Sequence, residues 1–448
     1  VIFMIFYYAK GGIVANVALL FNIFFILGIL ANLGAALTLP GIAGIVLTIG
    51  MSIDANVLIF ERIREEMRNG IPILQAISSG YQKAYSSIID ANVTTFLTGV
   101  ILYVLGQGPL KGFAVTLMIG IICSFFSAVF ITRVIITYMT KKGNDSKLSF
   151  DTPMSKGWLN NVHFDFLGKR RLAYLMSGIV IAVGIILMAT NGLRLGVDFK
   201  GGRSYVVNFD EAMTASDIKT SLSGMETFAN SGIEVKTYNT ANMLKVSPTI
   251  ADDIKDSSLE SFGLAILAIF FYILIRFRRW QFSLGAIIAL VHDSLIVLSA
   301  FAIAGLFGVN FEVDQVFIGA LLTIIGYSIN DTVVVFDRIR ENLQLKGSKD
   351  LVGTFNESIN STISRTLITS MTTLIVVVVL FIFGGEVLRG FSFAFLVGII
   401  VGTYSSIFIA SPIVVDLSKK TLSKAADKEQ EYSRAKASAK AAASANQA

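Results

Sequence analysis

The sequence predicts an all-α polytopic membrane protein, made of two related transmembrane bundles, with a small α+β domain on one side of the membrane. Three observations predict this class. Hydrophobic residues make up 54% of the 448 residues and charged residues only 15%, at a mean hydropathy of +0.70, which excludes an ordinary soluble globular chain. Apolar stretches of about 20 residues, the length of a spanning helix, recur about ten times. One segment of the first half also returns in the second half.

The apolar stretches place the predicted spans along the chain. Val1 to Tyr8 is typical of the last part of a hydrophobic helix and follows no initiator Met, so we expect a truncated N-terminus and an incomplete first span. Four spans are then predicted at 13–33, 39–60, 86–106 and 112–139. Six more are predicted at 172–191, 259–276, 283–307, 314–336, 363–384 and 389–415.

These spans divide the chain into a first bundle at 1–142, a linker at 143–171, a lone span at 172–191, an extramembrane segment at 192–258, a second bundle at 259–417 and a tail at 418–448. The extramembrane segment has a strand pattern near 203–209, a helical pattern near 214–224 and further strand patterns near 232–238 and 242–248. Strands with a helix on one face make an α+β domain, here close to the minimum size for a stable core.

Lysine and arginine lie mostly in one set of connections, which fixes the expected orientation. The opposite short connections hold little more than Lys111 and Arg389. The basic connections are those near 62–83, 141–171, 276–279, 338–349 and 419–420. By the positive-inside rule the linker and tail are cytoplasmic, and the segment 192–258 lies outside the cytoplasm. Orientation signals and lipid headgroups account for the net charge of +6, so we expect no nucleic-acid partner.

The repeat is carried by a 16-residue motif. Residues 50–65, from Gly50 to Glu65, return at 326–341 with a single carboxylate inside each apolar run, Asp54 or Asp331. Both copies run in the same direction, which predicts a parallel repeat about an axis along the membrane normal. Each copy ends in an acidic-Arg-x-Arg-acidic cluster, which is typical of a solvated helix end and could also form the cytoplasmic mouth of a pathway.

The two carboxylates lie deep within their helices. Asp331 stands seven residues before Arg338, about 10 Å along a helix, and Asp54 stands eight before Arg62. A carboxylate at that depth must be neutral, paired or wetted by a cavity. Arg365, near the start of the next span, is the expected partner of Asp331. The counterpart span of the first half carries Asp90 instead.

Two interpretations of these charges stay open. Buried carboxylates beside a mobile guanidinium are what a proton relay needs, because intramembrane ionisable groups usually mark ion pathways. Alternatively, they are static polar contacts between helices. His292 and Asp293, in the middle of a span, have no charged counterpart in the first half; they could extend the relay or form a structural pair.

Several site types are excluded or disfavoured. The other histidine, His163, lies in the linker, and the single cysteine, Cys123, in an apolar run, so we expect no metal site, disulfide or other cofactor. No phosphate-binding loop, catalytic Ser/His/Asp set or zinc-protease motif is present, so the chain is not expected to be an enzyme. Energy must come from an ion gradient or a partner, and carboxylates with hydroxyls suit H⁺ or Na⁺ equally.

At these motifs the chain resembles the protein-export membrane components SecD and SecF, fused as in SecDF proteins. Residues 1–142 are similar to the membrane part of SecD, through Gly-Met-Ser-Ile-Asp-Ala-Asn-Val at 50–57 and Asp-Ala-Asn-Val-Thr-Thr at 90–95. Residues 160–418 are similar to SecF. Their shared motifs are Leu-Gly-Val-Asp-Phe-Lys-Gly-Gly at 195–202, His-Asp at 292–293, Gly-Tyr-Ser-Ile-Asn-Asp-Thr-Val at 326–333 and Ser-Arg-Thr at 364–366.

The resemblance implies a member of the resistance-nodulation-division (RND) superfamily in the cell inner membrane. It implies an auxiliary subunit of the Sec translocase that uses the proton-motive force to pull preproteins out on the periplasmic side. The implied partners are the SecYEG channel, the SecA motor, the preprotein and the lipid bilayer, with YajC and YidC as further candidates. The residues that match the family's proton pathway are Asp54, Asp331 and Arg365. Measured against the family, the sequence starts after SecD's first span and large periplasmic domain, and its segment 192–258 is short.

Two other functions remain open at this stage. An RND-type exporter of lipids or small molecules would share the bundles, although such exporters usually carry two large loop domains. A non-conducting scaffold that only stabilises the translocon would tolerate neutral substitutions at Asp54, Asp331 and Arg365.

Overall fold

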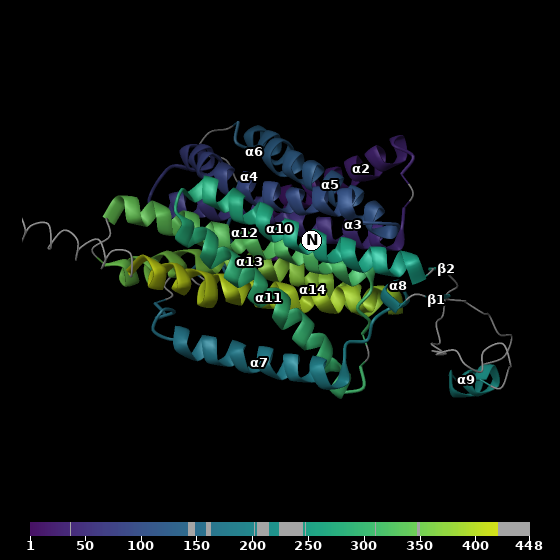
Figure 1. Cartoon of the computed structure of the whole chain (residues 1–448). Helices are drawn as coiled ribbons and strands as arrows, with labels where there is room; N and C mark the ends of the chain where they lie inside the picture. Colours follow the sequence, from purple (N-terminus) through teal and green to yellow (C-terminus); the bar gives the residue numbers. More distant parts are fainter. Residues whose placement is uncertain are drawn as a thin grey trace, which may run out of the picture.

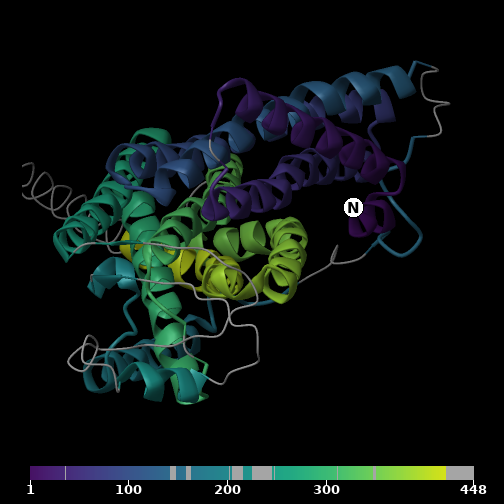
Figure 2. The same cartoon turned by 90° about the vertical axis from the view of Figure 1, so that its right-hand side faces the viewer.

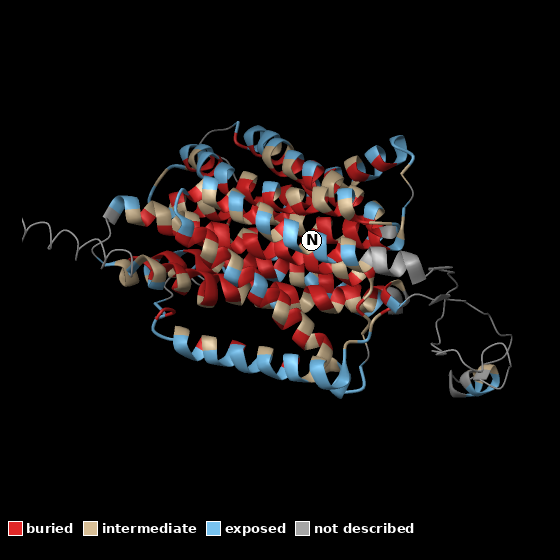
Figure 3. Ribbon diagram, in the orientation of Figure 1, coloured by how far each residue is buried: buried red, intermediate tan, exposed pale blue. Residues whose placement is uncertain are grey.

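The computed structural model describes residues 1–35, 37–141, 148–157, 163–200, 202–203, 215–223, 245–246, 248–309, 311–346 and 350–419. The described chain is almost entirely helical (Figure 1), and ten of its helices are long and apolar enough to cross a membrane. This confirms an all-helical polytopic membrane protein. Burial is concentrated where the long helices of the two halves meet (Figure 3).

The first half contains α1 (Ile2–Tyr8), α2 (Lys10–Asn32), α3 (Leu39–Arg68), α4 (Ile73–Leu105) and α5 (Pro109–Phe126), which continues through the π-helical turn η1 (Ser127–Ile131) into α6 (Thr132–Met139). The second half contains α7 (Arg170–Asn191), α10 (Pro248–Phe277), α11 (Trp280–Leu306), α12 (Gln315–Lys346), α13 (Leu351–Phe383) and α14 (Gly385–Ser405), which continues into the π-helical turn η3 (Ser406–Ala410). Seen along the bundle in Figure 2, the first half, purple to blue, stands above the green and yellow helices of the second.

The packing follows the sequence repeat. In the first half α3 packs against α4 and α5, and in the second half α12 packs against α13 and α14. Contacts between the halves are also reciprocal, because α12 packs against α4 while α3 packs against α13. The two helices that carry the repeated motif, α3 and α12, therefore each touch helices of both halves.

Four helices extend beyond their predicted spans at one end of the bundle, and α10 extends at the other end, where it begins at Pro248 and not at 259. The predicted spans 39–60 and 314–336 end in the structure at Arg68 and Lys346, and α4 and α13 begin about 12 residues before their predicted spans. Apolar length locates only the part of a helix that lipid can cover, whereas these extensions are charged and packed against each other. We call the end of the bundle with these extensions the linker end, and the opposite end the loop end.

The linker is held against the linker end at two places. Leu148 and Phe150 are buried against the first half, where the Gly11 amide donates to the Ser149 carbonyl oxygen at 3.1 Å. Phe166 and Leu167 are buried against the second half, where the Leu167 amide donates to the Asn356 side chain at 3.1 Å. Apolar pairs within a polar segment thus tie the linker to both bundles.

The predicted α+β domain is only partly described. The helix predicted near 214–224 is α9 (Ala215–Ser223), and two-residue strands β1 (Gly202–Arg203) and β2 (Lys245–Val246) pair antiparallel after the short helix α8 (Val197–Lys200). The predicted strand 232–238 and most of 203–209 lie outside the described residues. The strand predicted at 242–248 is wrong at its end, because Pro248 begins α10; proline is well suited to the first turn of a helix. No larger sheet is present in the described part of this segment.

Candidate functional site

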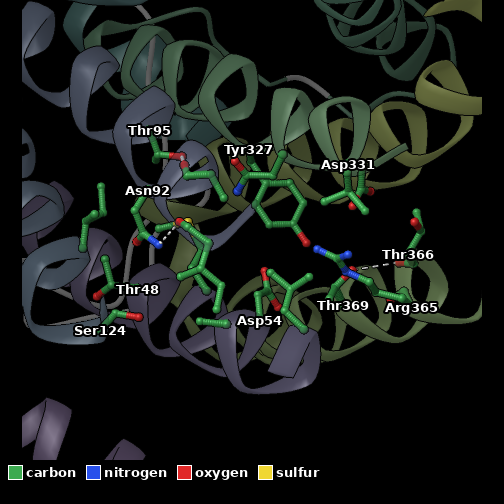
Figure 4. A pocket seen from close by; sticks show the side chains of 18 of the residues that line it. Thr48, Asp54, Asn92, Thr95, Ser124, Tyr327, Asp331, Arg365, Thr366 and Thr369 are labelled. Carbon is green, nitrogen blue, oxygen red and sulfur yellow. Dashed lines mark hydrogen bonds between the residues drawn. The ribbon is translucent and has the colours of Figure 1, made fainter. Parts of the chain in front are cut away.

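A cavity of about 50 Å³ lies inside the bundle, where α3 and α4 of the first half meet α12 and α13 of the second. It is lined by both deep carboxylates, Asp54 and Asp331, and by Arg365 (Figure 4). Since one water needs roughly 10–15 Å³, the cavity has room for a few waters. Three residues that the sequence placed on separate spans thus share one wettable space.

Asp331, on α12, is held by hydroxyl groups of its own half. Its side chain is 8% exposed, and its Oδ2 accepts from Ser370 on α13 and from Thr403 on α14, both at 3.3 Å. These two hydroxyls are 2.5 Å apart and can donate to each other. The carboxylate is therefore solvated by a small hydroxyl cluster that can reorient when its charge changes.

Asp54, on α3, is held by hydroxyls of the other half. Its Oδ1 accepts from Thr372 and Thr373 on α13, both at 3.4 Å. The same helix therefore supplies partners to both carboxylates, through Ser370 for Asp331 and these threonines for Asp54. A change of charge on either carboxylate acts on α13.

Arg365 enters the cavity from α13 without a direct ion pair to either carboxylate among the described residues, and one of its Nη atoms has no hydrogen-bond partner there. Asp331 and Asp337 attract its guanidinium and Arg62 repels it. An arginine held between opposing charges, with a spare donor, can shift its position when one charge is neutralised.

Arg365 also lines a second cavity, of about 190 Å³, at the linker end. Its other lining residues include Asp337, Arg62 and Arg338. Since Val334 and Arg365 line both cavities, these two side chains stand between the central cavity and the linker end.

Four charged side chains beside this second cavity form ion pairs that join the two halves, and we call them the ionic box: Arg62, Glu65, Arg338 and Glu341. Arg62 contacts Glu65 at 2.8 Å and Glu341 at 3.4 Å, and Arg338 contacts Glu341 at 2.9 Å and Glu65 at 2.8 Å. The repeated acidic-Arg-x-Arg-acidic clusters thus pair with each other across the halves, which neither copy of the motif alone could indicate.

Asp90 does not line the central cavity. It is 4% exposed, and its carboxylate accepts from Arg276 Nε at 2.7 Å and from the Tyr272 hydroxyl at 2.6 Å, both on α10. Arg276 also approaches Asp337 on α12 at 3.5 Å. Asp90 therefore belongs to an ion-paired contact between the halves.

His292 and Asp293, on α11, form a separate buried cluster that does not line either cavity described above. His292 Nδ1 lies 2.9 Å from Asp293 Oδ1, and Asp293 Oδ2 accepts from Ser328 at 2.5 Å and Ser405 at 2.8 Å. The structure does not bring this pair together with Asp54 and Arg365. Among the described residues no group of three His, Cys, Asp or Glu is arranged to hold a metal ion.

Tyr327 is a cavity residue that sequence reasoning missed. It lies between Asp54 and Asp331 in Figure 4, and both carboxylates act on it electrostatically. The signal was present in the repeat, because the equivalent position of the first copy is the apolar Met51.

Comparison with known proteins covers most of the chain. The family model described as "Protein export membrane protein SecD/SecF, C-terminal" matches residues 1–142 and 227–420, and that of the "SecD/SecF GG Motif" matches residues 186–213. Protein translocase subunit SecDF of Bacillus subtilis (strain 168) is 34% identical over 465 residues, covering 92% of this chain and 61% of that protein. Protein translocase subunit SecF of Rhodothermus marinus is 44% identical over 293 residues, covering 57% of this chain and 94% of that protein.

A crystal structure of SecDF from Thermus thermophilus, described as a translocon-associated membrane protein, matches with a TM-score of 0.82 at 34% identity. The match covers 93% of this chain and 60% of that one, so the chain spans about six tenths of the length of these SecDF relatives. The repeat, the helical architecture and the family models agree over most of the sequence, and the chain belongs to the SecD/SecF family of protein-export membrane proteins.

Proposed function

We propose that the chain is the membrane-embedded part of an auxiliary subunit of the Sec protein translocase, and that it uses the proton-motive force to promote preprotein translocation. Membership of the SecD/SecF family supports the assignment to protein export. The use of the proton-motive force is supported by the central cavity, which is lined by Asp54, Asp331 and Arg365. Ionisable groups are costly inside a membrane, and a wettable cavity with three of them suits an ion pathway.

The orientation follows from charge. The linker end, which carries most of the lysines and arginines, faces the cytoplasm, and the loop end faces the periplasm. Residues 192–258 then form a small periplasmic α+β domain, and the tail from 418 is cytoplasmic. Translocation also implies partners: the SecYEG channel, SecA and the preprotein, with YajC and YidC as further members of the assembly.

The coupling step is a shift of Arg365. When Asp331 is ionised, it attracts the guanidinium toward the central cavity; when a proton neutralises it, that attraction falls and Asp337 draws the guanidinium toward the second cavity. Because α13 carries Arg365 and also donates hydroxyls to Asp54 and Asp331, each proton transfer changes the forces on one helix. That helix contacts both halves, so the shift reaches the whole bundle.

The predicted pathway roles of Asp90, His292 and Asp293 stay predictions. Their clusters flank the proposed route: Asp90 is bound to Arg276, and Asp293 is bound to Ser328, three residues before Asp331 on α12. A proton would reach them only through intermediates outside the two cavities.

The test uses membrane vesicles that contain the SecYEG channel, SecA and this chain. The wild type should accelerate translocation of a preprotein, and an uncoupler should remove that acceleration. Asp331→Asn should insert normally and lose the uncoupler-sensitive part of the rate. Thr323→Ala is a matched control on the same helix, since the Thr323 hydroxyl donates to the Gly319 carbonyl oxygen of α12 and does not line the cavity. Full acceleration by Asp331→Asn would contradict the proposal and favour a non-conducting scaffold.

A further inference from the structure

Tyr327 lines the central cavity but has no role in the pathway proposed above. It comes from α12, one turn before Asp331, and it is 4% exposed. Its hydroxyl is buried, has no partner in good hydrogen-bond geometry among the described residues, and lies near the Thr373 and Ser370 hydroxyls that donate to Asp54 and Asp331. An unsatisfied buried hydroxyl costs free energy, so its place beside a wettable cavity calls for an explanation.

The phenol is near both carboxylates, which act on it electrostatically. Figure 4 shows its ring between Asp54 and Asp331, with the hydroxyl directed toward the guanidinium of Arg365. Asp54 and Asp331 belong to different halves and are not hydrogen-bonded to each other or to a shared residue. The pathway proposed above therefore lacks a group that passes a proton between them, and the phenol occupies that position.

We propose that the Tyr327 hydroxyl is the relay between Asp54 and Asp331, acting through the few waters for which the cavity has room. This inference rests on the proposed proton pathway and adds a named donor and acceptor to it. Protonated Asp54 gives its proton, directly or through a water, to the phenol oxygen. In the same step the phenol gives its own hydrogen toward the Asp331 carboxylate.

This exchange is balanced. One O–H bond breaks at Asp54 and one forms at Asp331, and the phenol has one hydrogen and no charge before and after. Rotation about the phenol C–O bond then restores the starting orientation. A hydroxyl can do this because it donates one hydrogen bond and accepts up to two, whereas Met51 at the equivalent position of the first copy cannot donate.

The test measures proton flux into proteoliposomes that contain the full chain and a pH-sensitive dye, driven by a potassium diffusion potential. Tyr327→Phe removes only the hydroxyl and should lower the flux about a hundredfold or more, because loss of one positioned proton-transfer group typically costs about 10²–10⁴-fold. Tyr81→Phe is the matched control. It also removes a buried hydroxyl that has no hydrogen-bond partner in the described part of the chain, from a tyrosine that does not line the cavity, and should leave the flux unchanged.

A second readout separates the relay from a packing role. Tyr327 replaced by 3,5-difluorotyrosine keeps both the ring and the hydroxyl. It should conduct far better than Tyr327→Phe, a difference that packing of the ring alone would not produce.

The outcomes are distinguishable. If Asp331→Asn lowers the flux and Tyr327→Phe does not, the relay is overturned and the proposed pathway stands. If the fluorinated protein conducts no better than Tyr327→Phe, the relay is likewise overturned. If the wild type and Asp331→Asn conduct equally, both the pathway and the relay are overturned.

Discussion

Arg276 on α10 and Asp90 on α4 lie 2.7 Å apart, between Nε and Oδ2, and this contact joins the second half of the bundle to the first. Asp90 is 4% exposed and has a second donor in Tyr272. Asp90→Ala leaves the guanidinium without its main partner and should lower the free energy of unfolding by about 2–4 kcal/mol. Chemical unfolding in detergent measures this. Asp90→Asn keeps one amide oxygen that can accept from one of the two donors, so it should lose less.

The same variants decide what Asp90 does for proton movement. If it only joins the halves, Asp90→Asn keeps the flux. If Asp90→Asn instead keeps the stability of the wild type and loses its proton flux, Asp90 belongs to the proton pathway, as the sequence suggested.

The ionic box makes a second prediction. Arg338 and Glu65 come from different halves and are partly exposed, so their coupling free energy should be modest, about 0.5–1 kcal/mol. A double-mutant cycle with Arg338→Gln and Glu65→Gln measures it, and the coupling should shrink as salt is raised. A coupling that is zero at low salt would show that the box does not hold the halves together.

Close helix packing makes a third prediction. A Cβ on Gly120, in α5, would lie 2.5 Å from Thr48 Cγ2 on α3, so Gly120→Ala should destabilise the fold by about 1–3 kcal/mol. Gly28 is the matched control, since a Cβ there meets no atom within 4 Å. Gly28→Ala should stabilise α2 by about 0.5–1 kcal/mol through helix propensity. Thermal unfolding of the two variants side by side tests both signs.

The fourth prediction is that the stability of the segment around Asp198, on α8 at the loop end and outside the spans, depends on pH. Burial, and then the nearby Glu312 carboxylate, raise the pKa of Asp198, while a hydrogen bond from the Gln315 amide at 3.1 Å opposes this rise. A raised pKa in the folded state means that protonation favours folding here. The stabilisation is complete below the ordinary carboxyl pKa and is lost as the pH rises through the raised value.

Hydrogen exchange of the Gly196 amide reports this contact, because that amide donates to the Val313 carbonyl oxygen at 2.8 Å. Asp198→Asn resembles the protonated form and should protect this amide more than the wild type at pH 8, and to a similar degree at pH 4. If the variant and the wild type protect this amide equally at pH 8 as well as at pH 4, ionisation of Asp198 does not weaken the contact between Gly196 and Val313.

The parts of the fold that depend on local pattern were predictable from the sequence. Apolar length located ten spans, and the copy of residues 50–65 at 326–341 indicated two related bundles. The charged extensions of α3 and α12 were not predictable in the same way, because hydropathy stops at the last apolar residue while helical packing continues to Arg68 and Lys346.

The site was predictable in its residues but not in its partners. Asp54, Asp331 and Arg365 could be selected because charge is rare within apolar runs. The partners of Asp90 could not, since Arg276 lies 186 residues away and meets it only through the packing of α10 on α4. Tyr327 was overlooked because an aromatic residue in a span is ordinary unless its hydroxyl is known to be buried beside two carboxylates.

The most direct test of the account is the potential-driven proton flux through proteoliposomes that contain the chain. The wild type should conduct, while Asp54→Asn, Asp331→Asn and Arg365→Gln should each reduce the flux at least tenfold and still insert. A wild type that conducts no more than these three variants would contradict a proton pathway through the central cavity.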